Sequence, residues 1–295
     1  MAIIERDCTT IEELWSQLSP VSSLINNLKK PIFRGQGDYR WHLTPTVFRD
    51  DIINKYSRKR IEYTRVSQVI EFEFSLLHGF IYGCDQQGIS VPYDSSKFRN
   101  YMNFDNVMAR YSDTSSGWPH EEFHTALAMA QHHGIPTRLL DWSKSSIVAM
   151  YFSASQALNL LNSKSLIGEK LAIWVIDANE RHLDEVGLKL ISTAGSVSAN
   201  LAAQKGVFLL NCEPESATYE DVFDPNIEKD KVDRLLANST SINAYKFTLP
   251  IELAGELLHW CDMFNVSSTS LFPGADGIAQ GVLEFKLAKR QRGRL

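Results

Sequence analysis

The run from Gln131 to Ser143, QHHGIPTRLLDWS, constrains the fold more than any other part of the sequence. Gly134 and Pro136 end a helix predicted from His120 to His132, because glycine favours a helix end and proline prevents its continuation. The residues from Thr137 to Asp141 are predicted to be extended, and Ser143 begins a further helix that runs to Leu161. The sequence therefore predicts a helix, a tight connection, a strand and a second helix in immediate succession.

The composition is that of an ordinary globular protein. Of 295 residues, 44% are hydrophobic and 22% are charged, and the formal net charge is -5. This excludes a disordered or fibrous chain, and it confines any nucleic-acid contact to a local basic patch. The one dense basic cluster, Lys289 to Arg294, is interpreted as a frayed, solvated tail in preference to a nucleic-acid contact.

The cysteines and the apolar stretches bear on location. The four cysteines are scattered and form no CxxC pattern, which suits a reducing compartment. The N-terminus lacks the apolar stretch of a signal peptide, and the apolar segment from Ile147 to Leu161 is too short and too polar for a bilayer. We therefore expect a cytoplasmic protein without a membrane association.

The remaining pattern indicates an α+β fold with a small mixed sheet. Strands are predicted at Pro31–Gln36, Leu171–Ile176, Gly206–Asn211 and Ile242–Leu249. Helices are predicted at Thr10–Leu18, across 52–82, near Phe98–Tyr111, at Ile251–Phe264, and after Gly274 to about Leu287. Helices dominate the first half and strands the second, which argues against a regular βαβ alternation.

The segment Phe33-Arg34-Gly35-Gln36 is the first candidate site. An arginine in an apolar strand is tolerated when its guanidinium is paired with a carboxylate or a phosphate, and Gly35 permits the close approach of a ligand or another backbone. The alternative is a structural ion pair between Arg34 and Asp141 or another acid.

The run Gln131–Ser143 is the second candidate site. His132 and His133 lie at a helix end, where the dipole favours a proton, and Arg138 and Asp141 bracket two leucines. Ser143 can cap the next helix, whose N-terminus favours anions, so Arg34, Arg138 and this helix end together are expected to hold a diphosphate. The alternatives are a buried Arg138–Asp141 pair and a Ser143 that only caps the helix.

The pattern His120-Glu121-Glu122-Phe123-His124 matches the HExxH motif of zinc metalloproteases. Zinc enzymes of this kind need a third ligand, and no suitably spaced histidine or glutamate follows. We therefore expect no metal, and we interpret the pattern as an acidic, partly exposed helix start.

Several of these motifs together resemble the FRG-domain family, which is named for its Phe-Arg-Gly. The resemblance rests on FRGQ at Phe33–Gln36, on HHGIPTRLLDWSKSSIVAMYFSA from His132, and on LFPGADG from Leu271. It implies a single domain over 1–295, with a motif core at 31–155, a helical insertion at 51–118 and a strand and helix part at 165–288. The family is associated with bacterial and phage conflict systems, which implies a role in phage defence or as a toxin.

A more distant resemblance is to ADP-ribosyltransferases, and it implies that NAD is bound. Phe33-Arg34-Gly35 is similar to their first strand motif, in which the arginine holds the diphosphate or ribose of NAD. Trp142-Ser143-Lys144-Ser145, followed by Ala149 and Phe152, is similar to their serine-rich strand end and the helix after it. Gln204 stands where these enzymes carry a catalytic glutamate, and an amide cannot act as a base.

Two functions follow as hypotheses. The first is an NAD-binding, ADP-ribosyltransferase-like protein that acts on a macromolecule. In it, His133 and Gln204 lie at the reacting centre, and the cofactor is held by Arg34, Gly35, Gln36, Arg138, Asp141 and Ser143. The second is a non-catalytic module that binds a nucleotide or a nucleic acid and leaves the activity to a partner protein. Both hypotheses predict that Arg34, His133, Arg138, Asp141 and Gln204 converge on a single pocket.

Overall fold

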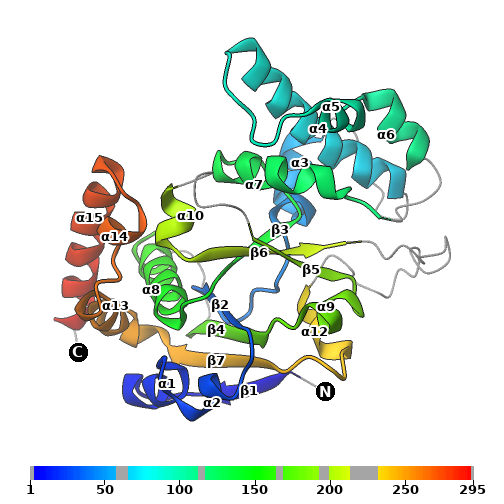
Figure 1. The fold of residues 1–295 in the computed structure, drawn as a ribbon. Coiled ribbons are helices and arrows are strands. Elements are labelled where there is room, and N and C mark those ends of the chain that lie inside the picture. Colours follow the sequence, from blue (N-terminus) through cyan, green and yellow to red (C-terminus); the bar gives the residue numbers. More distant parts are fainter. Residues whose placement is uncertain are drawn as a thin grey trace.

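A mixed seven-stranded sheet forms the centre of the protein, with the strand order β1-β7-β4-β2-β3-β6-β5 (Figure 1). The structure is a computed structural model that describes residues 3–57, 66–111, 117–163, 169–192, 199–212 and 232–293. The strands are β1 (Ile4–Asp7), β2 (Pro31–Gln36), β3 (Leu139–Ser143), β4 (Lys170–Asp177), β5 (Leu188–Ile191), β6 (Gly206–Asn211) and β7 (Ala244–Pro250). β1 pairs with β7 in parallel, and the other neighbouring strands are antiparallel.

Helices from both ends of the chain cover one face of the sheet, on the side of β1, β7 and β4. They are α1 (Ile11–Leu18), α2 (Ser23–Asn26), α8 (Ser146–Asn162), α13 (Ala254–Met263), α14 (Ser268–Leu271) and α15 (Ala275–Arg292). Side chains alternate along each strand, so Ile173 and Val175 pack in the core beneath α8, whereas Trp174 and Ile176 lie in a different core on the other face. The helix α8 lies directly over β2 and β4.

Shorter elements cover the opposite face. They are α9 (Glu180–Asp184) and α12 (Val232–Asn238), whereas the 3-10 helix η1 (Thr46–Phe48) packs with α3 (Asp50–Tyr56) and α4 (Val66–Gln86) through Val47. Leu183 of α9 and Leu236 of α12 are fully buried there, together with Trp142 of β3. The sheet is therefore covered on both faces, which explains why β4 is a nearly continuous apolar run.

A helical lobe stands at the β6 end of the sheet (Figure 1). It consists of α3 (Asp50–Tyr56), α4 (Val66–Gln86), α5 (Ser96–Tyr101), α6 (Phe104–Arg110), the 3-10 helix η2 (Glu121–Phe123) and α7 (His124–His132). Phe74, Trp118 and Phe123 form an aromatic centre in this lobe, and Phe208 and Leu210 of β6 belong to the same core. The lobe and the sheet therefore share one hydrophobic core.

The α+β class and the mixed sheet predicted from the sequence are confirmed. The Thr10 hydroxyl caps α1 by accepting a hydrogen bond from the Glu13 amide, as the sequence predicted. Strand β1 was not predicted because its four side chains are exposed and show no apolar pattern. The predicted helix at 52–82 is divided into α3 and α4, with 58–65 outside the described residues.

Two further expectations are corrected. Ser143 does not begin a helix, since it is the last residue of β3, and α8 starts at Ser146. The basic tail is helical as far as Arg292, where Gln291 docks by accepting from the Gly255 amide at 2.5 Å and donating to the Ile251 carbonyl at 2.9 Å. In the described part of the chain, no helix has both the length and the apolar character that crossing a bilayer requires.

Gly35 allows β2 and α8 to approach each other, which yields a test. A β-carbon on Gly35 would lie 2.0 Å from the Ala149 carbonyl oxygen, so Gly35→Ala must displace backbone, and we expect it to lower the free energy of unfolding by more than about 2 kcal/mol. Gly79→Ala in α4 is the matched control, because nothing lies within 4 Å of the added atom. It should raise stability by about 0.5–1 kcal/mol, since alanine favours a helix. Urea unfolding of both variants measures the difference, and equal effects would contradict the packing.

Candidate ligand-binding cavity

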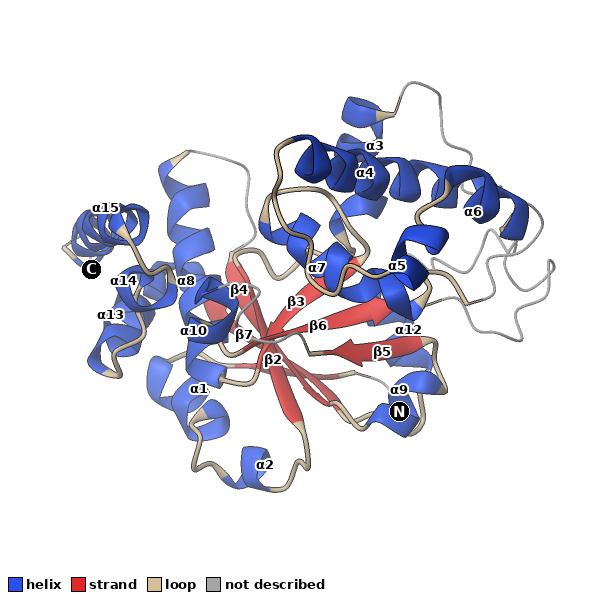
Figure 2. Cartoon of the chain, turned by 45° about the horizontal axis from the view of Figure 1, so that its top comes forward, coloured by secondary structure: helices blue, strands red, loops and turns tan. Residues whose placement is uncertain are grey.

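A cavity of about 380 Å³ lies against β2, β3 and β6, between α7 and α8. Figure 2 shows β3 and β6 between these two helices. The residues that line the cavity are Phe33, Arg34, Gly35, Ala128, Gln131, His132, Asp141, Trp142, Ser143, Ala149, Phe152, Gln156, Asn200, Leu201, Gln204, Gly206, Val207, Phe208 and Phe272. Its volume falls within the range of about 300–1,000 Å³ that is typical of small-molecule sites.

Arg34 lies where β2 and β3 separate. The two strands pair through Phe33 and Ser143, and beyond this pair the Nη1 of Arg34 donates to the main-chain carbonyl of Asp141 at 2.5 Å. Its Nε atom is buried and has no hydrogen-bond partner in the structure. Burial lowers the pKa of the Arg34 guanidinium, and the Asp141 carboxylate opposes this shift. Since an arginine stays charged in proteins, a cation with one unsatisfied donor is held at the cavity.

The Asp141 side chain is exposed and is oriented by α7. Nε2 of Gln131 donates to the Asp141 carboxylate at 2.8 Å, and Oε1 of the same amide accepts from the Thr137 hydroxyl. This chain fixes the orientation of the Gln131 amide, because each end has a different partner. The expected contact between Arg34 and Asp141 is therefore present, but Arg34 bonds the main-chain carbonyl of Asp141 and not its carboxylate. The carboxylate is bonded to Gln131 of α7, and Asp141 lines the cavity.

Ser143 and Gln204 connect β3 to the loop before β6. The Ser143 hydroxyl donates to the Gln204 carbonyl at 2.7 Å and accepts from the Ser145 amide at 3.0 Å. Gln204 follows α10 (Ala199–Ala203), and its Nε2 donates to the Leu271 carbonyl at 3.2 Å. Lys205 next to it has a positive φ of 48°, which turns the chain into β6. Ser143 thus orients a loop and not the helix that follows it.

Gly35 and Gln36 were both expected to hold the cofactor, but their surroundings differ. Gly35 lines the cavity, where it also leaves room for α8. Gln36 is buried, and its Oε1 accepts from the Trp174 indole at 2.7 Å while its Nε2 donates to the His42 carbonyl at 3.3 Å. The structure therefore places Gln36 in the packing of the sheet and outside the lining of the cavity.

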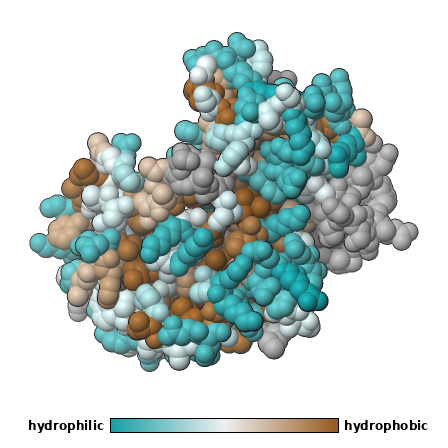
Figure 3. All heavy atoms as spheres, in the orientation of Figure 1, coloured by the Kyte–Doolittle hydropathy of each residue, from teal (hydrophilic) through white to brown (hydrophobic). Residues whose placement is uncertain are grey.

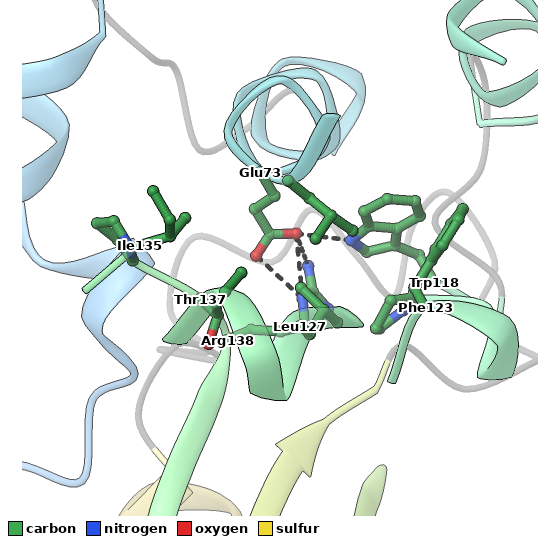
Figure 4. A pocket seen from close by; sticks show the side chains of 11 residues that line it. Glu73, Trp118, Phe123, Leu127, Ile135, Thr137 and Arg138 are labelled. Atoms are coloured by element: carbon green, nitrogen blue, oxygen red, sulfur yellow. Dashed lines mark hydrogen bonds and ion pairs between the residues drawn. The ribbon is translucent and has the colours of Figure 1, made fainter. Parts of the chain in front are cut away.

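Arg138 lies in a separate, buried cluster (Figure 4). Its Nε and Nη2 donate to the Glu73 carboxylate of α4, with Nη2 at 2.5 Å, and its Nη1 donates to the Asn211 carbonyl at 3.0 Å. The Trp118 indole also donates to Glu73, at 2.6 Å. Both side chains of the ion pair are about 95% buried, with exposures of 4% and 5%. Arg138 therefore does not join Arg34 at the cavity, and its acid partner is Glu73 and not Asp141.

His133 also lies outside the lining of the cavity. It is exposed, and its ring stacks on Phe80 of α4 with a centroid distance of 5.9 Å. The neighbouring His132 lines the cavity instead. Burial, and after it the electrostatic effect of the neighbouring His133, lower the pKa of His132 below its usual value, which favours the neutral imidazole. The prediction that five residues share one pocket therefore holds for Arg34, Asp141 and Gln204 but is wrong for His133 and Arg138.

The HExxH pattern does not form a metalloprotease helix. His120 precedes η2, where its Nδ1 accepts from the Glu122 amide and its ring stacks on Tyr101 at 3.9 Å. His124 is in α7, and burial lowers its pKa. No group of three or more metal-ligating side chains is found among the residues that the structure describes.

Several lining residues were missed by the sequence analysis. Gln156 and Asn200 were not singled out, whereas Phe152 was part of the transferase-like motif and does line the cavity. Phe272 belongs to the LFPGADG segment, so the presence of this segment in the motif was a signal that it reaches the site. No sequence signal identifies Asn200, because its position depends on the loop that precedes β6.

The buried cluster generates a prediction on stability. Arg138→Met leaves the Glu73 carboxylate buried without its cation, so we expect a loss of about 3–5 kcal/mol in the free energy of unfolding. Arg99→Met is the matched control, because Arg99 pairs with Asp85 and Asp94 at the surface, and it should cost less than about 1 kcal/mol. Chemical denaturation measures both values. A loss below about 1 kcal/mol for Arg138→Met would show that the buried pair contributes little.

The comparisons with known proteins agree with the motifs. The model of the FRG domain matches residues 29–160, a range that contains β2, the helical lobe, β3 and most of α8. No curated protein and no solved structure matches the chain. The matched range supplies Arg34, Asp141 and Ser143 to the cavity, whereas Gln204 and Phe272 come from the chain that follows it. The chain therefore contains an FRG domain over residues 29–160.

Proposed function

We propose that the cavity binds NAD and that the chain is an ADP-ribosyltransferase-like protein acting on a macromolecule. One observation carries this proposal. Three positions are similar to transferase motifs: Arg34 in β2, Ser143 in β3 and Gln204 in the loop before β6. The strands β2, β3 and β6 are neighbours in the sheet. All three residues line the same cavity although they are distant in the sequence.

The lining suits the chemistry of a dinucleotide. Arg34 provides a fixed cation for a diphosphate oxygen, and its unpartnered Nε is a donor that such an oxygen would satisfy. Phe33, Phe152 and Phe208 supply aromatic surface for a nicotinamide or adenine ring. The Asp141 carboxylate is an acceptor for ribose hydroxyl groups. At about 380 Å³, the cavity is of a size to hold one half of the dinucleotide and leave the other at its mouth.

The position of Gln204 bears on catalysis. In transfer of ADP-ribose, the bond to nicotinamide breaks and positive charge develops on the ribose, which a carboxylate stabilises and an amide does not. Asp141 is the acid among the described residues that line the cavity. We infer that Gln204 orients the ribose through its amide and that the wild-type protein cleaves NAD slowly unless Asp141 or a partner supplies the charge.

A second candidate function is a non-catalytic module that binds a nucleotide or a nucleic acid. The amide at Gln204 favours it, since its Nε2 is already engaged with Leu271. Either function is compatible with a defence or toxin effector in a bacterial or phage conflict system. We place the protein in the cytoplasm in both cases, because its four cysteines are buried and scattered along the sequence and NAD and nucleotides are present there.

Arg34→Lys tests the binding proposal. Lysine keeps the charge but loses the planar guanidinium, so the variant should fold normally and lose most of the thermal stabilisation that millimolar NAD gives to the wild type. Arg49→Lys is the matched control. Arg49 is exposed and its charge acts on Arg34, but its guanidinium donates to the Thr44 carbonyl and it does not line the cavity. It should keep the wild-type response to NAD.

Two results would reject NAD binding at this site. One is a wild-type protein that shows no shift in melting temperature at millimolar NAD. The other is Arg34→Lys that keeps the full shift. A shift with AMP or RNA but not with NAD would instead support the module that binds other nucleotides, and retention on RNA should then fall steeply with salt because phosphate contacts release counterions.

Gln204→Glu tests the catalytic part of the proposal separately. The added carboxylate should raise the rate of nicotinamide release from NAD at least about tenfold, because a well-placed acid or base contributes about 10²–10⁴ in rate. Gln204→Ala is the control, and it should bind NAD without any gain in rate. If Gln204→Glu binds NAD as tightly as the wild type but releases no more nicotinamide, the non-catalytic function is favoured.

A further inference from the structure

The helix α15 has an inverted polarity, with its polar side facing the protein. Glu284 is buried and accepts hydrogen bonds from the Tyr151 hydroxyl at 3.0 Å, from the Ser155 hydroxyl at 2.5 Å and from the Gln280 amide at 2.8 Å. Gln291, two turns later on the same side, is held by main-chain groups near the start of α13. These bonds fix the rotation of α15 about its axis, and they therefore determine which side chains of the helix face outward.

The outward face of α15 is apolar between Ile278 and Phe285. Its large side chains are Ile278, Val282, Leu283 and Phe285, with exposures of 55%, 56%, 66% and 63%. Ile278, Val282 and Phe285 follow a spacing of three to four residues, so they form one stripe along the helix. Figure 3 shows brown and tan atoms gathered over the edge of the molecule that α15 forms. A soluble helix normally turns such a stripe inward, so its exposure marks an interaction surface.

The charges on the same face differ between its two ends. The exposed acid Asp276 lies in the first turn, and the exposed bases Lys286, Lys289, Arg290 and Arg292 lie in the second half. A helix with an acid at its start, apolar residues in its middle and bases at its end is complementary to itself when two copies run in opposite directions. In a parallel pair, the same bases would repel each other.

We propose that α15 pairs with α15 of a second copy of this chain, antiparallel about a two-fold axis near Val282. In this register Ile278 packs against Phe285 of the partner subunit, and Val282 and Leu283 each lie beside the same residue of the other copy. Asp276 then faces Arg290 of the partner subunit at the rim. Such an isologous contact is the commonest form of assembly among soluble proteins.

The first test is the oligomeric state in solution. Sedimentation and light scattering of the full chain should detect a dimer. The concentration should span about 1–100 µM, which covers micromolar dissociation constants. Val282→Arg should give a monomer, since it places two like charges on the two-fold axis. Val21→Arg is the matched control, because Val21 is 83% exposed and lies on the segment between α1 and α2. It should stay dimeric.

The second test addresses the register. Arg290→Asp should raise the dissociation constant of the dimer at least tenfold. Adding Asp276→Arg should bring this constant back to within about threefold of the wild-type value, because the two charges of the pair are then exchanged. In Val282→Cys, mild oxidation should give a disulfide-linked dimer, since the four native cysteines are buried and two cysteines at the axis lie close together.

Three outcomes would overturn the proposal. The first is a wild type that remains monomeric throughout the concentration range, and the second is a Val282→Arg dimer as strong as that of the wild type. The third is a monomer that binds vesicles of phosphatidylserine and phosphatidylcholine through the same residues, which would assign the face to a membrane surface. If adding Asp276→Arg fails to restore dimerisation of the Arg290→Asp variant, the antiparallel register is wrong.

Discussion

The buried contact between Arg138 and Glu73 joins the two parts of the protein. Glu73 lies on α4 in the helical lobe, and Arg138 directly precedes β3, which crosses the sheet. Because both charges are removed from water, each requires the other, and Trp118 and the Asn211 carbonyl satisfy most of their remaining hydrogen-bonding capacity. The pair holds the lobe against β3 and β6, and this position places α7 beside the cavity with Gln131 in reach of Asp141. A site on the sheet therefore depends on an ion pair that does not touch it.

The cavity exists because two chain segments approach the sheet closely, one at β2 and one at β6, and leave space between them. Gly35 allows α8 to lie against β2, and Gly206 accommodates Leu201 at the start of β6, where a β-carbon would meet the Leu201 side chain at 2.3 Å. One wall is thus fixed by a backbone contact with α8 and the other by the Leu201 side chain of α10. This leaves Arg34, Asp141 and Gln204 as polar groups among aromatic side chains, an arrangement suited to a ligand with both charged and planar parts.

The sequence predicted the central strands and part of the lining of the candidate cavity. Strands β2, β4, β6 and β7 were identified because buried strands are continuous apolar runs, whereas β1 has no buried side chain to reveal it. Arg34, Asp141 and Gln204 were correctly grouped through their motifs. The partner of Arg138 could not be found, since Glu73 lies 65 residues earlier in a helix without a motif. His132 and His133 are adjacent, and only the rotation of α7 determines which of them faces the cavity.

The parallel pairing of β1 with β7 has a consequence for the order in which the protein folds. Asp7 contacts Thr248 across 241 residues of sequence, and the Cys8 amide donates to the carbonyl of the same threonine. During synthesis, the first strand emerges from the ribosome long before its neighbour exists, so that edge of the sheet is completed only after the chain has been made as far as Pro250. Such non-local contacts form slowly, and until then β4 lacks its outer neighbour. A nascent chain stalled before β7 would therefore expose apolar strand edge to chaperones, even though the helical lobe it carries is already complete.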